Sequence, residues 1–257
     1  TYTITGTTLG CTSTDQATVT VLPNAPINAG TDAVICTGAS TTLTATGGVT
    51  YTWSPATGLS ATTGASVTAN PTTTTTYSVT GTDASGCIGT DQVLVTVNPL
   101  PTINGGVDQT VCAGQTVTLT ATGGATYTWA PVVTNGTAFT PAATGTYTVT
   151  GTDANGCINT DQVLVTVNPL PTIAVADVTI CATATATLTA TGATTYTWAP
   201  ATNLSAATGA TVTFTPGTTT TYTITGTTLG CTSTDQATVT VLPNAPINAG
   251  TDAVICT

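Results

Sequence analysis

Eight cysteines are the residues of this chain with the clearest capacity for chemistry. Six of them recur as one cysteine before a long alternating segment and one after a late turn: Cys36 and Cys87, Cys112 and Cys157, Cys181 and Cys231. Regular spacing in a chain without histidine favours disulfides over a metal site, and disulfides persist in oxidising compartments. The cysteines therefore predict an extracellular or cell-surface location.

The carboxylates are the second group with possible chemistry. Ten aspartates supply the whole net charge of −10, because the chain has no lysine, arginine or glutamate. Four of them near the late turns are candidate calcium ligands, since carboxylates are hard oxygen donors: Asp83, Asp91, Asp153 and Asp161. The competing interpretation is that Asp153 serves its turn and Asp161 gives solubility. We expect no cofactor, with calcium as the weaker alternative.

The sequence lacks the residues that catalysis and binding to nucleic acids or membranes usually require. No serine or threonine has a histidine or lysine to act as its base, and two aspartates alone supply no substrate pocket for glycoside hydrolysis. Without basic side chains the chain cannot neutralise the phosphates of nucleic acids or anionic membranes. No apolar run of about 18 residues occurs that could span a bilayer. We expect no catalytic or cofactor-binding residues, no nucleic acid and no membrane insertion.

Internal repetition sets the organisation of the chain. Residues 1–37 recur unchanged as residues 221–257, which gives an exact period of 220 residues. A looser repeat divides this period into repeat 1 (22–97), repeat 2 (98–167) and repeat 3 (168–241). Residues 1–21 then correspond to the last strands of a preceding repeat, and 242–257 to the first strand of the next. We expect the chain to be an internal segment of a longer tandem array.

The repeats have the pattern of β-structure throughout. In repeat 2, residues 116–122 alternate threonine with apolar residues at period two, as in a half-buried strand. Further strands are expected at 126–129, 145–152 and 162–167, the last two joined by a turn at 153–156. Strands at this spacing without helical periodicity predict an all-β sandwich of about seven strands in each repeat.

The expected core recurs in each repeat. A leucine precedes a tryptophan by ten residues, and a tyrosine follows the tryptophan by 24, 18 and 24 residues, with an aliphatic residue two places later. An inward tryptophan against an aliphatic residue of the other sheet is central to immunoglobulin-like sandwiches, and the tyrosine has the position of a tyrosine corner. The predicted core residues are Leu43, Trp53, Tyr77, Val79, Leu119, Trp129, Tyr147, Val149, Leu188, Trp198, Tyr222 and Ile224.

A family resemblance covers the whole chain. Residues 29–36 (AGTDAVIC) and 106–112 (GVDQTVC) open two repeats, and 146–157 (TYTVTGTDANGC) and 163–167 (VLVTV) close one. These segments resemble the PKD-like and Ig-like tandem repeats of large secreted cell-surface proteins of Bacteroidota, including adhesins and gliding-associated proteins. The resemblance implies tandem immunoglobulin-like sandwiches and export from the cell. Repeat 3 departs from the pattern, since Thr-Leu-Gly precedes Cys231.

The disulfide register follows from the expected topology. Cys112 ends the first strand at the pole where the last strand ends, whereas Cys157 starts the last strand at the opposite pole. About eight strand residues separate the poles by some 25 Å, while bonded cysteines need Cα atoms within about 7 Å. We favour bonds between neighbouring repeats, Cys36–Cys157 and Cys112–Cys231, with Cys11, Cys87, Cys181 and Cys256 pairing beyond the segment. The alternatives are bonds within repeats (Cys36–Cys87, Cys112–Cys157 and Cys181–Cys231), and lateral bonds or free thiols.

Linkers and surface residues complete the expectations. Each linker, such as 97–103 (VNPLPTI), contains two prolines that keep it extended. We expect a structural protein that forms a rigid extracellular fibre or stalk with copies of itself as partners, or alternatively a cell-surface adhesin that binds a glycan or a surface. Candidate glycosylation sites, which would carry glycans on threonine or asparagine, are Thr72, Thr73, Thr74, Thr75, Thr76, Asn135 and Asn203.

Overall fold

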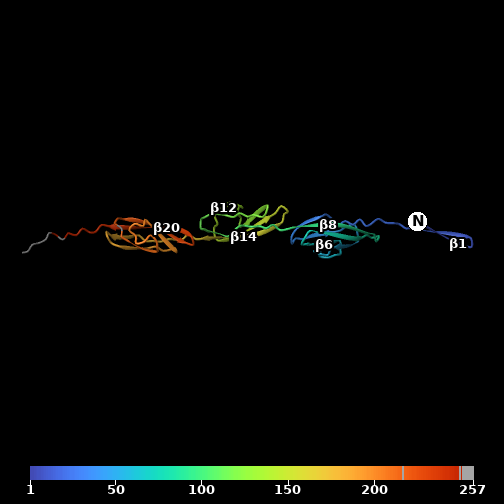
Figure 1. Ribbon diagram of the computed structural model, residues 1–257, viewed down its shortest axis with the longest axis horizontal. Helices are drawn as coiled ribbons and strands as arrows, with labels where there is room; N and C mark the ends of the chain where they lie inside the picture. Colours follow the sequence, from blue (N-terminus) through green and yellow to red (C-terminus); the bar gives the residue numbers. More distant parts are fainter. Residues whose placement is uncertain (216, 249, 251–257) are drawn as a thin grey trace, which may run out of the picture. The chain divides into compact units, whose positions relative to one another are not determined.

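The computed structural model describes residues 1–215, 217–248 and 250 of the chain (Figure 1). Every named element in these residues is a β-strand, and none of them is a helix that could cross a membrane. Residues 249 and 251–257 of the expected next repeat, including Cys256, lie outside the described residues. The described residues therefore have the all-β fold that the sequence predicts.

Repeat 1 contains six strands in two sheets. They are β3 (Ala33–Cys36), β4 (Thr41–Thr44), β5 (Thr50–Ser54), β6 (Ser66–Ala69), β7 (Thr75–Thr82) and β8 (Ile88–Asn98). One sheet has the order β3-β8-β7-β5 and the other is the antiparallel pair β4-β6. The two sheets carry the inward faces of the immunoglobulin-like sandwich.

Repeats 2 and 3 have the same six strands in the same sheet orders. In repeat 2 they are β9 (Gln109–Cys112), β10 (Val117–Thr118), β11 (Thr126–Ala130), β12 (Ala138–Phe139), β13 (Gly145–Thr152) and β14 (Ile158–Asn168). In repeat 3 they are β15 (Val178–Cys181), β16 (Ala186–Thr189), β17 (Thr195–Ala199), β18 (Thr211–Phe214), β19 (Thr220–Thr228) and β20 (Cys231–Leu242).

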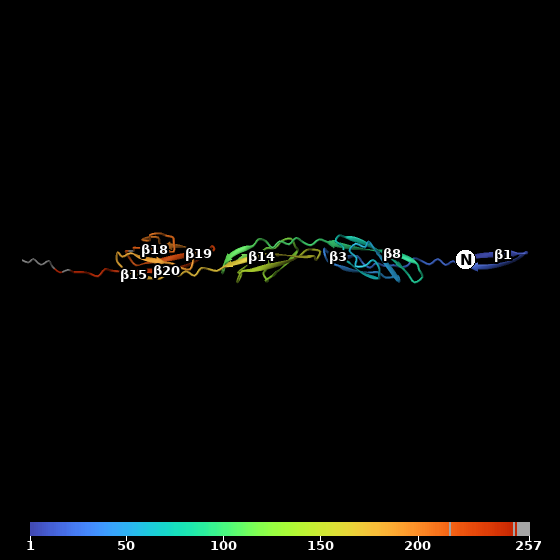
Figure 2. The same cartoon turned by 90° about the horizontal axis from the view of Figure 1, so that it is seen from below.

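The first strand of each repeat pairs in parallel with the last strand. In repeat 3, β15 pairs with β20 so that Cys181 lies opposite Leu242, and Figure 2 shows these two strands side by side. The same register places Cys36 opposite Asn98 and Cys112 opposite Asn168. Each first-strand cysteine therefore lies at the end of the sandwich where the last strand ends.

The predicted core lies inside the sandwiches. All twelve predicted core residues are buried, with exposed fractions of 7% or less. In repeat 1, Trp53 lies opposite Val79 on the neighbouring strand and packs in one cluster with Leu43 of the other sheet. Burial of large side chains on both sheets is the main favourable term for a domain of this size.

Two details of the expected sandwich are wrong. Each repeat has six strands rather than about seven in the described residues, because the segments that would add a strand form only isolated bridges such as Leu59 with Ala69. The core tyrosines do not form tyrosine corners in repeats 1 and 3. The Tyr77 hydroxyl donates to the Thr57 carbonyl oxygen at 2.7 Å, 20 residues upstream, because it reaches across to the connection between the sheets.

Strands β1 (Tyr2–Thr8) and β2 (Cys11–Ala17) form a hairpin that no second sheet covers. Its sequence is identical to that of the hairpin in repeat 3. Tyr2 and Ile4 are 69% and 68% exposed, whereas Tyr222 and Ile224 are fully buried. The same residues are buried only where a second sheet covers them, since a two-stranded hairpin alone has no interior.

Compact packing groups the chain into two units. The first comprises Thr1–Ile103, Gly123–Thr126 and Gly151–Asn159, and the second comprises Asn104–Thr122, Tyr127–Thr150 and the described residues from Thr160 onward. The first unit contains the core of repeat 1, and the second contains the core of repeat 3. A segment of repeat 2 thus belongs to the same compact unit as repeat 1.

Repeat 2 compensates for a shorter connection between its sheets. In repeats 1 and 3 the tryptophan indole donates to a backbone carbonyl, as Trp53 Nε1 does to Gly64 at 3.0 Å. In repeat 2 the side-chain oxygen of Asn135 replaces that carbonyl and accepts from Trp129 Nε1 at 3.2 Å and from the Ala121 amide at 2.7 Å. The expected strand 116–122 is reduced to Val117–Thr118, because the short connection leaves β12 only two residues long.

Replacing Asn135 with alanine should destabilise repeat 2 by about 1–3 kcal/mol, because two partly buried donors lose their acceptor. The matched control is Asn155→Ser, which places the residue of repeat 1 at an exposed turn position. Urea unfolding followed by tryptophan fluorescence measures the difference. Equal unfolding midpoints for the two variants would contradict this role of Asn135.

Candidate functional site: disulfide-bonded repeat ends

Two disulfides join neighbouring repeats. Cys36 bonds to Cys157 and Cys112 bonds to Cys231, each with a Cα–Cα distance of 5.6 Å. The bonded residues are 121 and 119 positions apart in the sequence. Each bond therefore connects the first strand of one repeat to the late hairpin of the next, the pairing that the topology favours.

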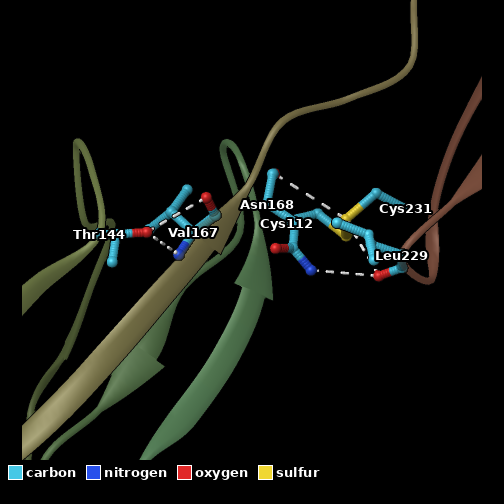
Figure 3. Close-up of a disulfide and its surroundings, with 6 residues drawn as sticks. All are labelled: Cys112, Thr144, Val167, Asn168, Leu229 and Cys231. Atoms are coloured by element: carbon cyan, nitrogen blue, oxygen red, sulfur yellow. Dashed lines mark hydrogen bonds between the residues drawn. A yellow bond between two sulfur atoms is a disulfide. The ribbon is translucent and has the colours of Figure 1, made fainter.

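The strands position the four sulfur atoms. Cys112 ends β9, and Cys231 opens β20 directly after the turn at Leu229 and Gly230 (Figure 3). Cys157 directly precedes β14, an 11-residue strand whose far end lies beside Cys112. That strand separates Cys112 from Cys157 by roughly 33 Å, so the alternative bonds within repeats do not form.

Hydrogen bonds accompany each covalent link. Asn168 Nδ2 donates to the Leu229 carbonyl oxygen at 3.2 Å, and Cys231 Sγ lies 3.9 Å from the Asn168 carbonyl oxygen (Figure 3). At the preceding link, Asn159 Nδ2 donates to the Pro101 carbonyl oxygen in the linker at 2.9 Å. The bonded cysteines Cys157 and Cys231 are buried. The links are therefore packed, polar contacts rather than isolated bonds.

Three cysteines have no disulfide partner in the described residues: Cys11, Cys87 and Cys181. Cys11 and Cys181 are exposed, and Cys87 is half-buried. Their pairing beyond the segment remains a prediction at this point.

Six aspartates form reciprocal clamps between the start of each repeat and its last strand. In repeat 1, the carboxylate of Asp32 accepts from the Leu94 amide and that of Asp91 accepts from the Ala29 amide, both at 2.8 Å. Asp108 and Asp161 accept from Leu164 and Gly105 in the same way, and Asp177 and Asp235 accept from Thr238 and Val175. Each clamp fixes the register of the parallel strand pair that carries the first-strand cysteine.

These clamps were not predicted from the sequence, although their aspartates recur at a fixed distance from the cysteines. Each clamping aspartate lies four residues before a first-strand cysteine or four residues after a hairpin cysteine. A fixed offset in all three repeats indicates a shared structural role, which solubility alone would not require.

The calcium candidates have backbone partners instead of a shared site. The Asp153 carboxylate accepts from the Asn155 and Cys157 amides, both at 2.8 Å, and so closes the turn that presents Cys157. Asp83 does the same before Cys87. Asp91 and Asp161 belong to the clamps, and the described residues contain no cluster of three or more potential metal ligands. Asp153 therefore stabilises its turn, as the competing interpretation expected. Asp161 instead accepts a hydrogen bond from the Gly105 amide, so a role in solubility alone does not describe it.

The candidate glycosylation sites differ in accessibility. The Asn135 side chain is held by Ala121 and Trp129, whereas Asn203 is exposed. In the threonine run, the Thr74 hydroxyl accepts from the Val97 amide and the Thr75 hydroxyl donates to Thr73. The side chains with exposed positions in this run are Thr72, Thr73, Thr74 and Thr76.

Two hollows lie at equivalent positions in repeats 1 and 3, beside the buried side chains of Tyr51 and Tyr196. Their volumes are about 420 and 390 Å³, and threonine, glycine and alanine line most of each. Neither hollow has a carboxylate or a cysteine among its lining residues. The only titratable side chain that lines each hollow is its tyrosine, whose hydroxyl is hydrogen-bonded to the backbone of Gly48 or Ala193.

Comparison with family models identifies the class of domain in part of the chain. Residues 23–99 match the model described as "Ig-like domain CHU_C associated". Together with the sheet orders of all three repeats, this match defines the chain as a tandem array of immunoglobulin-like β-sandwiches. A comparison with curated proteins found no match.

Solved structures of fragments from two other proteins are also similar to this chain. An I-band fragment from titin is 12% identical with a TM-score of 0.41, and the match covers 82% of this chain and 96% of the fragment. Extracellular domains 3–5 of Drosophila OTK are 13% identical with a TM-score of 0.37, and the match covers 86% of this chain and all of that chain. Identities at this level carry no information about function.

The clamps predict loss of stability in acid. The Ala29 and Gln92 amides lower the pKa of Asp91, and the Gly105 and Gln162 amides lower the pKa of Asp161. A lowered folded-state pKa adds stability that is fully present above the unfolded value, about 3.9, and is lost as the pH falls through the folded value. Unfolding midpoints in urea should therefore be level above about pH 5 and decrease below about pH 4.

The variants Asp91→Asn and Asp161→Asn test this assignment. Each should lower the unfolding midpoint at pH 7 and make the decrease in acid shallower, because the charged acceptor is gone. Asp15→Asn is the control, since the Asp15 carboxylate accepts from the adjacent Gln16 amide in the exposed hairpin and has no other hydrogen-bond donor among the described residues. If the unfolding midpoint falls as steeply below about pH 4 in both clamp variants as in the control, the clamps are not the cause of the loss of stability in acid.

Proposed function

We propose that the chain is part of a non-enzymatic extracellular structural protein, a fibre or stalk built from tandem immunoglobulin-like repeats. The observation that carries this proposal is the disulfide between neighbouring repeats. Domains joined by a linker alone have one connection at each boundary and can hinge about it. A second covalent connection at each boundary restricts both bending and twisting.

The linkers support the same function. Pro99 and Pro101 lie in the linker between repeats 1 and 2, and Pro169 and Pro171 in the next. Proline fixes φ and keeps a connection extended. Because the Asn159 side chain also donates a hydrogen bond to the Pro101 carbonyl oxygen, the repeat that follows the linker holds it in place. Linker and disulfide together form a two-point junction.

The surface favours a fibre over an adhesin. An adhesin of this class would present exposed aromatic side chains on at least one repeat for a glycan or a surface. In the described residues of repeats 1 to 3, no tryptophan or tyrosine is exposed. Copies of the same repeat along the fibre are the proposed partners. Glycans on the exposed threonines Thr72, Thr73, Thr74 and Thr76 are a proposed modification.

Electron microscopy of single 257-residue chains before and after reduction tests the proposal. In oxidised chains the angle between neighbouring sandwiches should have a narrow distribution, because both connections are in place. Reduction should broaden it while far-UV circular dichroism stays unchanged, since each sandwich has its own core. The variant Cys87→Ser should behave like the unmodified chain, because Cys87 has no disulfide partner in the described residues. Equal angular distributions in oxidised and reduced chains would contradict a mechanical role for the bonds.

A further inference from the structure

Cys87 and Cys181 have no disulfide partner in the described residues. Each has the same position in its repeat as a cysteine that is bonded to a neighbouring repeat. Cys181 ends the first strand of repeat 3, just as Cys36 and Cys112 end theirs. After each of these cysteines the next amide donates to the last residue of the last strand: Ala182 to Leu242, Thr37 to Asn98 and Ala113 to Asn168, all at 2.8 Å. Cys181 is therefore placed like two cysteines that are bonded.

Cys87 is the matching half. The Asp83 carboxylate accepts from the Ser85 amide at 2.8 Å and from the Cys87 amide at 3.0 Å, and the Asp83 amide donates to the Cys87 carbonyl at 3.0 Å. The same three bonds form around Asp153 and Cys157, and Gly86 and Gly156 both have the positive φ that this turn requires. Cys87 is thus presented like Cys157, which is bonded to the preceding repeat.

The residues after repeat 3 have the same sequence as the opening of repeat 1. Residues 242–257 are identical to residues 22–37, the linker and first strand that open repeat 1. In repeat 1 this linker packs on Gly89, where a Cβ atom would overlap the Ala25 carbonyl oxygen. Repeat 2 has Asn159 at that position, so the linker type and the hairpin residue are matched. In repeat 1, a linker of this type leads into the hairpin that presents Cys87.

We infer that Cys181 forms a disulfide with Cys87 of the following copy of the 220-residue period in the same chain. This inference rests on the proposed fibre and extends its two-point junction across the boundary between periods. The bond forms by exchange with a small organic disulfide such as oxidised glutathione. The two protein thiols become one disulfide, and the oxidant takes up their two electrons and two protons as two glutathione thiols.

A chain extended by one exact period, residues 1–241 followed by 22–257, tests the inference. The added period brings six cysteines. After refolding in a glutathione redox buffer, denaturation and alkylation with iodoacetamide, mass spectrometry counts the free thiols. If Cys181 bonds to the next Cys87, the extended chain has the same number of free thiols as the 257-residue chain. Two additional thiols would overturn the inference.

Two further measurements separate the possible failures. The variant Cys181→Ser in the first period should add one free thiol to the extended chain, because it releases Cys87 of the second period. Non-reducing peptide mapping reports the Cys36–Cys157 and Cys112–Cys231 bonds in both periods. If these bonds are present and two additional thiols appear, this inference fails and the proposed fibre stands. If these bonds are absent as well, the proposed function also fails.

Discussion

The bond from the first strand of one repeat to the late hairpin of the next is the constraint on which the other features depend. A parallel first strand carries its cysteine to the end of the sandwich where the chain leaves, and a hairpin brings the second cysteine to the end where the chain enters. Within a repeat these two ends are a strand length apart. Only a neighbouring repeat can supply the partner, so the topology of one sandwich already determines how repeats are joined.

The aspartate clamps follow from the same constraint in a chain without cationic side chains. No lysine or arginine is available to pair with a carboxylate, so backbone amides take that role, with oxygen to nitrogen distances of 2.7 to 3.1 Å. Charge-assisted hydrogen bonds of this kind are stronger than neutral ones. They hold the short first strand, which has only four residues in repeat 1, against the last strand and so keep its cysteine in position for the neighbouring repeat.

Much of the fold could be predicted because the same sequence pattern occurs in all three repeats. Period-two alternation and the recurring tryptophan and tyrosine predicted the strands and the core, and the all-β sandwich class is confirmed. Asn135 could not be predicted as a core acceptor, because its role depends on a connection that is too short to supply a backbone carbonyl. The strand count and the tyrosine corner were wrong for a similar reason, since both depend on how the connections between sheets run rather than on the alternation within strands.

Non-reducing peptide mapping of the 257-residue chain tests the central claim most directly. A protease that cleaves after aromatic residues and leucine separates all the cysteines of interest, because such residues lie between each of them. The account predicts one peptide pair that links Cys36 to Cys157 and another that links Cys112 to Cys231. Recovery of Cys112 linked to Cys157 would contradict it, because that bond would join the two ends of a single sandwich.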